Sequence, residues 1–280
     1  MRTKYLKHSA AAGHYSKSTA VKITTYNVLR DGWEHDLEEI DNDRKRVIPW
    51  KKRRLNVKKR ISKLDPDILC LQEVTDEMLG DIIKDARYET AIIGKRGRSS
   101  GQSMQCAIVF KHEQFDRLEC QELGEVGRFV TCTLKHKLSE HIFCVASVHP
   151  VAGESTENET FRVKQFVDLF RVLSHIHPNA FFVCGDFNTD ERIRDRGGVA
   201  LKNRVHPLFR RNAYENASGT RVTYHGWAPL TFDYIYMKGG EGTQLRVLKR
   251  IMNDISKTPI PSGKEGSDHV AVTVQLKVDS

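Results

Sequence analysis

Polar side chains able to bind a metal or a phosphate stand where the apolar runs of this chain end. They are Asn27 in ITTYNV, Glu73 in LCLQEV, His149 in VASVHP, Asp186 and Asn188 in VCGDFN, Asp233 in TFDYIY, and Asp268 with His269 in GSDHV. Leaving such groups unpaired inside a protein costs several kcal/mol, so they must pair with each other, with backbone or with a metal. Carboxylate oxygens suit Mg²⁺, which also takes water and phosphate oxygens. Convergence of these residues at one edge of a β-sandwich would therefore create a site for phosphate chemistry.

Each residue taken alone also has an ordinary structural explanation. Asn27 can cap a turn, Glu73 can lie at the start of a helix, and His149 can be a hydrogen-bonded core histidine. Asp186 can form an Asx turn, and Asp233 can be a buried acid bonded to a backbone amide. The recurrence of ligand-type residues at so many strand ends favours the functional interpretation of the set.

The elements that position these residues alternate along the chain. Strand-length runs rich in β-branched and aromatic residues recur, among them VKITTYNVL, DILCLQEV, MQCAIVF, HIFCVASVH, AFFVCGDFN, TFDYIYM and HVAVTVQL. Helical spacing predicts helices over residues 50–64, 76–86 and 159–176. Many strands with helices between them indicate an α/β sandwich, in which two sheets pack face to face and the helices lie outside.

Two of these helices have a well-defined apolar face. In the 50–64 helix it contains Val57, Ile61 and Leu64, with Lys and Arg on the remaining surface. In the 159–176 helix we expect Val163, Phe166, Val167, Phe170 and Leu173 to share the buried face.

Length and composition indicate one globular domain. The chain has 280 residues and a formal net charge of +9. We expect a single domain over residues 21–280, preceded by a basic, disordered tail over residues 1–20 that contains no acid. The tail also fits a mitochondrial transit peptide, but its amphipathic pattern is poor, so a cytoplasmic location is favoured. No apolar stretch approaches the roughly 18 to 20 residues needed to span a bilayer.

The six cysteines stand singly, and most lie inside apolar runs. No C-x-x-C pair occurs. This distribution predicts reduced core cysteines rather than a disulfide framework.

The motifs TYNV, LQEV, SVHP, GDFN, FDYIY and GSDH follow one another from about residue 21 to residue 275. In this order they closely resemble the endonuclease/exonuclease/phosphatase superfamily of Mg²⁺-dependent phosphohydrolases. The resemblance implies a four-layer α/β sandwich made of two mixed sheets. It also implies that Glu73 is the main metal ligand, that Asn27 and Asp268 lie near the same ion, and that Mn²⁺ can replace Mg²⁺.

The resemblance implies catalytic roles as well. Asp186 would activate or orient the attacking water, and Asn188 and His149 would hydrogen-bond the phosphate. Asp233 would accept a hydrogen bond from His269 and favour its cationic form beside the phosphoryl oxygens. Such a site would act by positioning and charge neutralisation, as phosphoryl transfer requires.

Further segments resemble the deadenylase/nocturnin-like branch of the superfamily. They are residues 48–74 with their Trp-x-x-Arg pattern, the run SMQCAIVFK, and PIPSGKEGSDHVAV. This likeness implies RNA as the substrate, shortened from its 3′ end to release 5′-mononucleotides. The sequence TDERIRDRGGVALKNR after GDFN departs from the branch, which leaves the base preference open.

Basic and aromatic residues outside these motifs are candidates for substrate contact. The candidates are Lys95, Arg96 and Arg98 in a Gly/Ser-rich loop, Trp33 and Trp227 as platforms for a base, and Arg162, which is either a phosphate contact or a surface residue. Residues 44–60 hold ten Lys or Arg among seventeen positions. Such a run is usually a solvated helix face, but it can also follow a nucleic-acid backbone.

Two other functions compete with a nuclease. The same site would serve a phosphatase or phosphodiesterase acting on a small or lipid phosphate ester, since only the surrounding walls differ. A binding module that recruits nucleic acid without cutting it is disfavoured because every ligand-type residue is present. The protein is expected to act as a monomer.

Overall fold

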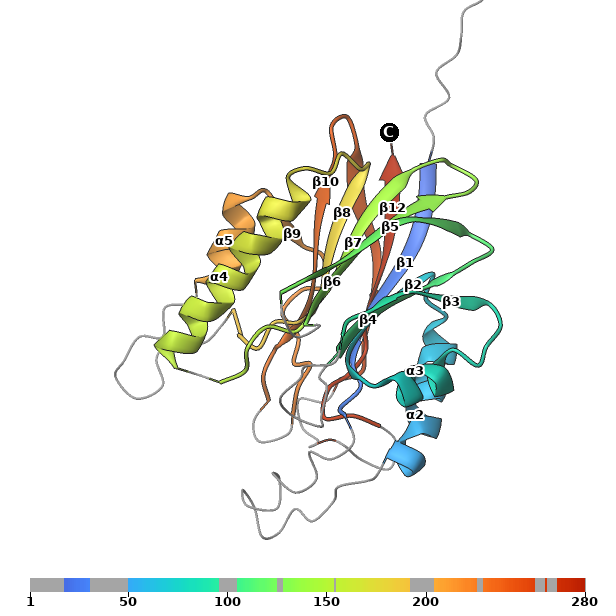
Figure 1. Ribbon diagram of the computed structural model, residues 1–280, viewed down its shortest axis with the longest axis vertical. Coiled ribbons are helices and arrows are strands. Elements are labelled where there is room, and N and C mark those ends of the chain that lie inside the picture. The colour runs from blue at the N-terminus through green and yellow to red at the C-terminus, as the bar shows by residue number, and fades with distance from the viewer. Residues whose placement is uncertain are drawn as a thin grey trace, which may run out of the picture.

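Two six-stranded mixed sheets form the centre of the molecule (Figure 1). The computed structural model describes residues 18–30, 50–95, 105–124, 128–153, 155–191, 204–225, 229–254, 260 and 266–279. The first sheet has the order β11(Gln244–Ile251)-β12(Val272–Asp279)-β1(Ser18–Asn27)-β2(Ile68–Val74)-β4(Gln105–Lys111)-β3(Tyr88–Ile93). The second has the order β5(Phe115–Leu123)-β6(Phe129–His136)-β7(Ile142–Val148)-β8(Ala180–Asp186)-β10(Asp233–Gly239)-β9(Glu215–Asn216).

Each sheet has one parallel pair of strands at its centre. In the first sheet β1 runs parallel to β2, with Ile23 opposite Ile68 and Asn27 opposite Gln72. In the second, β7 runs parallel to β8, with Phe143 opposite Ala180. Parallel neighbours need a long crossover, and a helix lies in each of the two connections. The carboxyl ends of the strands in each parallel pair therefore meet at one edge of their sheet.

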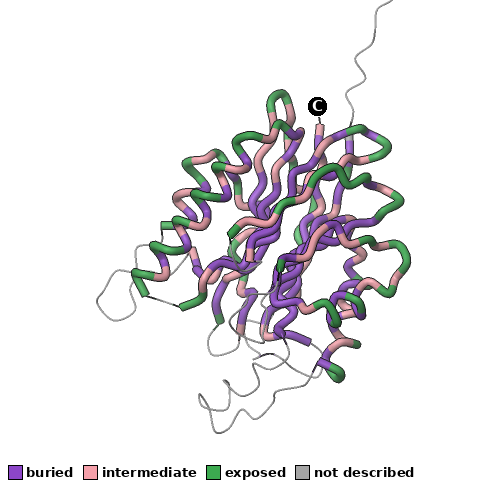
Figure 2. Tube along the Cα trace, in the orientation of Figure 1, coloured by how far each residue is buried: buried purple, intermediate pink, exposed green. Residues whose placement is uncertain are grey.

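The helices lie on the outer faces and complete four layers (Figure 1). Helices α2(Trp50–Leu64) and α3(Asp76–Ile82) pack on the first sheet, while α4(Thr156–Leu173) and α5(Val205–Arg211) pack on the second. Between the sheets lies an apolar core that includes Ile23 and Phe182, both fully buried. Much of the central strands is coloured as buried in Figure 2. The predicted α/β sandwich is thus confirmed.

Helix α2 has the predicted bounds and buries Val57, Ile61 and Leu64 as expected. Thr75 caps α3, where its side chain accepts a hydrogen bond from the amide of Met78 at 3.2 Å. Helix α5 was not predicted, because its seven residues are too few to show a periodic pattern.

The buried face of α4 differs from the prediction. Val167 is 39% exposed, whereas Leu169 is fully buried. The buried positions are Glu159, Arg162, Phe166, Leu169 and Leu173, which follow one another at steps of three and four. Two charged residues thus share the face with apolar ones, and a search for apolar spacing alone selects a different stripe.

The N-terminal boundary also differs slightly from the expected one. Strand β1 begins at Ser18, which pairs with Asp279 of β12. Residues 18–20 therefore belong to the first sheet rather than to a tail, and residues 1–17 lie outside the described residues.

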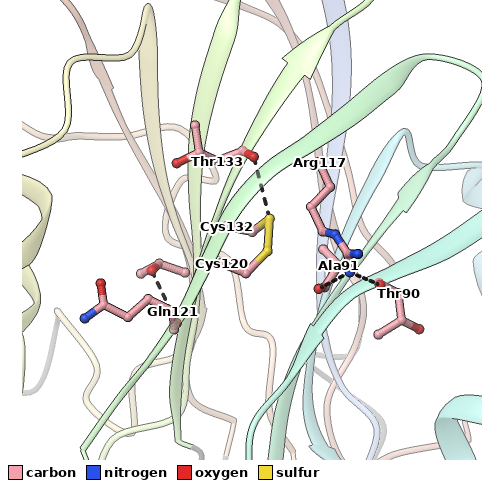
Figure 3. The surroundings of a disulfide bond; sticks show 8 residues. Thr90, Ala91, Arg117, Cys120, Gln121, Cys132 and Thr133 are labelled. Atoms are coloured by element: carbon pink, nitrogen blue, oxygen red, sulfur yellow. Dashed lines mark hydrogen bonds between the residues drawn. A yellow bond between two sulfur atoms is a disulfide. The ribbon is translucent and has the colours of Figure 1, made fainter.

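One pair of cysteines contradicts the expectation that all are reduced. Cys120 of β5 and Cys132 of β6 are directly opposite in the antiparallel register and form a disulfide (Figure 3). Their Cα atoms are 4.1 Å apart, and the sulfurs are brought together by a strand pairing that cysteine spacing does not reveal. The other cysteines, Cys70, Cys106, Cys144 and Cys184, are free and buried, as predicted.

Among the described helices, none has the length and apolar composition of a membrane span.

Candidate active site

The ends of β1 and β2 place an amide and a carboxylate in contact. Asn27 is fully buried, and its Nδ2 donates to Glu73 Oε1 at 2.9 Å. The other oxygen of Glu73 accepts from the backbone amide of Arg30 at 3.2 Å. Glu73 has a φ of 56°, and the pairing of β2 with β4 shifts register between Leu71 and Val74. A left-handed residue beside a bulge re-aims a side chain at some cost in backbone energy, which is typical of functional sites.

The ends of β7 and β8 bring His149 and Asp186 to the same place from the second sheet. Asn27 Nδ2 also donates to Asp186 Oδ2, at 3.0 Å, so one amide connects the two sheets. His149 Nε2 lies 3.6 Å from Asp186 Oδ2 and 3.7 Å from Glu73 Oε1. Gly185 allows this approach, since a Cβ there would lie 2.0 Å from the carbonyl oxygen of Val148.

Asp233 and His269 form a short hydrogen bond beside Asp186. The distance from His269 Nδ1 to Asp233 Oδ2 is 2.7 Å, and Asp233 is fully buried. The other ring nitrogen, Nε2, lies 3.5 Å from Asp186 Oδ2. A carboxylate that accepts from Nδ1 fixes which nitrogen of the ring faces the site. Asp233 is held in turn, because the Thr223 hydroxyl accepts its backbone N–H at 3.0 Å.

The two site histidines differ in charge preference. Burial disfavours the charged form of His269, but the carboxylates of Asp233, Asp186 and Asp268 outweigh it and hold the pKa of His269 well above its ordinary value. Burial lowers the pKa of His149, although Asp186 and Glu73 act in the opposite direction. His269 is therefore suited to donate from its cationic form, while His149 favours the neutral form.

The pKa values of the site carboxylates are shifted in different directions. Burial raises the pKa of Glu73, but His149 and the Asn27 amide outweigh this and leave it below its ordinary value. Burial raises the pKa of Asp186 and raises that of Asp268 to about 6, with His269 opposing both shifts. Several acids thus crowd one buried place, where their ionised forms need a compensating cation.

The donor set fits a divalent metal ion. Ligand atoms of Glu73, His149 and Asp186 all lie within 4.8 Å of one another. Within the described part of the chain, the ion pairs of Glu73 and Asp186 are with histidines alone, and neither carboxylate pairs with Lys or Arg. Oxygen ligands of this kind suit hard cations. Asn27, which we also expected near the ion, contacts both Glu73 and Asp186 through its amide, at 2.9 and 3.0 Å.

Asp268 lies beside this group, where burial and then the charges of Glu73 and Asp186 raise the pKa of its carboxyl. Its side chain is half-buried, and Oδ1 is 3.3 Å from the hydroxyl of Ser267. Ser267 itself is fully buried and donates to the carbonyl oxygen of Asn27 at 2.8 Å. This serine fixes the spacing between the Asn27 strand end and the Asp268–His269 pair, and we did not predict it.

Asn188 is positioned by the loop that follows His149. Its Nδ2 donates to the carbonyl oxygen of Pro150 at 3.1 Å, and its backbone amide donates to Asp186 Oδ1 at 2.8 Å. Its φ is 52°, a left-handed conformation that asparagine tolerates better than most residues. The side chain is half-buried at the surface of the site.

Arg53 connects two of the loops that carry site residues. Its guanidinium donates to the carbonyl oxygens of Val28 at 2.9 Å, Leu29 at 2.6 Å and Gly266 at 2.7 Å. Only 2% of Arg53 is exposed. The arginine of the Trp-x-x-Arg pattern is therefore an internal anchor for the site and not part of the solvated face of its helix.

The residues predicted to contact the substrate lie in different environments. Arg162 is buried rather than on the surface, where it pairs with Glu159 at 2.8 Å and donates to the carbonyl oxygens of Val151 and Gly153. Lys95 is exposed at the end of β3, with its backbone amide bonded to Glu122. The remaining candidates, Trp33, Arg96, Arg98 and Trp227, lie outside the described residues.

Comparison with known proteins agrees with this geometry. The family model described as "Endonuclease/Exonuclease/phosphatase family" matches residues 24–269. The chain belongs to this family. Because its members are phosphoric-ester hydrolases, the enzyme class expected from the sequence is confirmed.

Curated relatives place the chain among the nocturnin-like members of the endonuclease/exonuclease/phosphatase family, as the motifs indicated. Protein angel of Drosophila melanogaster is 24% identical over 91% of this chain and 80% of its own length. Nocturnin of Mus musculus is 24% identical over 92% of this chain, which spans 65% of Nocturnin. The solved structure "ANGEL2, a 2′,3′-cyclic phosphatase" has a TM-score of 0.71 at 19% identity and covers 93% of this chain and 96% of its own.

Proposed function

We propose that this protein is a Mg²⁺-dependent phosphodiesterase that shortens RNA or single-stranded nucleic acid from the 3′ end and releases 5′-mononucleotides. The observation that carries the proposal is the junction where both sheets end. There Glu73 and Asp186 share one amide donor, and His269, whose pKa is held well above its ordinary value by neighbouring carboxylates, lies 3.5 Å from Asp186. An anionic phosphodiester can enter such a site because a metal ion and an imidazolium offset its charge.

In this proposal, some site residues bind the metal ion and another activates the attacking water. Glu73 would hold the ion, with Asn27 and Asp268 at its sides, and Mn²⁺ can take the place of Mg²⁺. When bound, Mg²⁺ supplies positive charge to a phosphoryl oxygen. Asp186 orients the attacking water and accepts its proton, since the backbone amide of Asn188 fixes its other oxygen at 2.8 Å.

Three side chains face the phosphate in this proposal. His269 donates to a phosphoryl oxygen from Nε2, because Asp233 occupies Nδ1. Asn188 would hydrogen-bond the phosphate through its side-chain amide, and His149 through its imidazole. The Asp233 carboxylate keeps His269 cationic through turnover, which favours the extra charge that develops on the equatorial oxygens.

The nucleic-acid substrate is supported by charge and by relatives. The net charge of +9 favours a polyanionic partner. One structural neighbour with a TM-score of 0.62 is Danio rerio TDP2 "complexed with single strand DNA product". We further propose that the protein acts as a monomer.

A second candidate function is hydrolysis of a 2′,3′-cyclic phosphate at an RNA end. It is favoured by the likeness to ANGEL2, which is described as a 2′,3′-cyclic phosphatase. The chemistry uses the same site, because water again attacks phosphorus and a ribose oxygen leaves.

One assay separates the two functions. Purified protein is incubated with 5′-labelled RNA carrying either a 3′-hydroxyl or a 2′,3′-cyclic phosphate, in Mg²⁺ or EDTA, beside the Asp186→Ala variant. A Mg²⁺-dependent ladder on the 3′-hydroxyl RNA supports the exonuclease, whereas opening of the cyclic end without shortening supports the second function. Intact RNA of both kinds would contradict both and direct the search to small or lipid phosphate esters.

A further inference from the structure

Helix α2 carries a row of exposed lysines with no acidic partner. Its fifteen residues, WKKRRLNVKKRISKL, contain no Asp or Glu. Lys51, Lys52, Lys59 and Lys63 are exposed, and Lys58 is half-exposed. Among the described residues none of these five lysines forms an ion pair, whereas the neighbouring Arg54 pairs with Asp81 at 3.2 Å. The row is therefore a concentration of uncompensated positive charge.

The spacing of the lysines places them on one side of the helix. Lys52, Lys59 and Lys63 follow one another at seven and four residues, which keeps them close to a single line along the surface. With a rise of 1.5 Å per residue, this line extends over about 16 Å. The opposite side, with Val57, Ile61 and Leu64, is buried against the first sheet.

The N-terminal turn of α2 lies at the candidate active site. Arg53, in that turn, donates to the carbonyl oxygens of Val28 and Leu29, just after Asn27, and of Gly266, just before Asp268. Gly266 packs so closely on the helix that a Cβ there would lie 2.8 Å from Val57 Cγ2. The first turn of the lysine helix is therefore anchored to the two loops that carry Asn27 and Asp268.

We propose that this exposed face of α2 binds the phosphate backbone of a single-stranded nucleic acid whose end occupies the active site. The inference rests on the proposed function, which it deepens by assigning a path for nucleotides beyond the scissile bond. Lysines act as point charges on flexible stems, so such a surface binds backbone without selecting bases. An anionic membrane is the less favoured partner, because the apolar side of the helix is packed on the sheet and not available to enter a bilayer.

Neutralising three lysines tests the proposal. The variant Lys52→Gln/Lys59→Gln/Lys63→Gln removes three exposed charges without touching the site. Each phosphate contact on a single strand contributes about 0.7 to the slope of log affinity against log salt. The slope for a 20-nucleotide RNA, measured by fluorescence anisotropy in EDTA, should become less steep by about 2. Binding at 50 mM salt should weaken at least tenfold.

A matched control removes three positive charges from the helices that pack on the second sheet. The control residues, Lys164, Arg171 and Arg211, are exposed on α4 and α5. The variant Lys164→Gln/Arg171→Gln/Arg211→Gln should leave the salt slope within about 0.5 of wild type, since these residues would contact no phosphate. Equal loss in both triple variants, or an unchanged slope in the α2 variant, would overturn the proposal. Binding of the α2 face to phosphatidylserine vesicles but not to RNA would overturn it too.

A dinucleotide substrate separates this inference from the proposed function. The dinucleotide fills the active site without reaching along α2, so the α2 variant should hydrolyse it with kcat/KM within about twofold of wild type. If the wild-type protein hydrolyses neither RNA nor the dinucleotide, the proposed function is refuted. The anisotropy result would still decide whether the α2 face binds RNA.

Discussion

Replacing Arg53 with methionine should destabilise the protein far more than the same change at the adjacent Arg54. The Arg53 guanidinium donates to three backbone carbonyl oxygens at 2.6 to 2.9 Å and is almost completely buried. A methionine leaves all three acceptors without these donors. Hydrogen bonds to a charged group contribute about 1.5–3 kcal/mol each, but three bonds from one group are not additive. We expect a loss of about 3–5 kcal/mol in the free energy of unfolding.

Arg54 provides the matched control. Its side chain is 42% exposed and makes one ion pair, with Asp81 at 3.2 Å. Exposed pairs contribute about 0–1 kcal/mol, so Arg54→Met should cost no more than that. Urea denaturation followed by far-UV circular dichroism measures both values. Arg53→Lys should lie between the two, because an ammonium cannot reach three carbonyls with the geometry of a guanidinium.

Activity must fall together with stability if Arg53 holds the site. Kinetics at low temperature and without denaturant, where the variant is folded, should show kcat at least tenfold below wild type, since the Asn27 and Asp268 loops lose their common anchor. KM for a dinucleotide should change less. Equal destabilisation by Arg53→Met and Arg54→Met, or a destabilised Arg53 variant with wild-type kcat, would refute the reasoning.

Three further outcomes are expected. Asp233→Asn removes a carboxylate that raises the pKa of His269, so the imidazolium should lose its proton at lower pH. The alkaline limb of the profile of kcat/KM against pH should therefore move to lower pH. An unmoved limb would exclude His269 as the titrating group. Glu73→Gln should weaken Mn²⁺ binding at least 100-fold in a spin-resonance titration, and wild-type affinity would remove Glu73 from the metal site. The Cys120–Cys132 disulfide closes a loop of sequence separation 12, so its reduction should lower the free energy of unfolding by about 3 kcal/mol. Dithiothreitol should therefore lower the melting temperature of the wild type and leave that of a Cys120→Ser/Cys132→Ser variant unchanged.

The sequence was most informative where local pattern and tertiary burial agree. Helix α2 could be predicted in both bounds and buried face because its apolar residues recur at helical spacing and no charged residue but Arg53 joins them in the interior. The candidate site residues also lie together for a topological reason. Asn27, Glu73, His149 and Asp186 stand at or near the carboxyl ends of the two parallel strand pairs. Asp233 and His269 reach the same edge because they stand at or before the starts of strands antiparallel to β8 and β1.

The features that sequence reasoning missed depend on contacts between distant segments. Glu159 and Arg162 are buried in α4 because each satisfies the other, with Glu159 also accepting two backbone amides at the start of α5. The Cys120–Cys132 bond depends on strand register, which single cysteines do not encode. Ser267 appeared as one more loop residue, and only the fold shows that it bonds to the end of β1.

The division of the site between two sheets has a consequence for its mechanical behaviour. Asn27 and Glu73 extend from the first sheet, whereas His149 and Asp186 extend from the second, and Asn27 Nδ2 is bonded to a carboxylate on each side. A sliding of one sheet over the other by a fraction of an ångström would lengthen one of these bonds while leaving each sheet intact. The apolar layer between the sheets therefore sets the alignment of these four candidate catalytic residues. Catalytic rate should report on the packing of that layer as sensitively as thermal stability does.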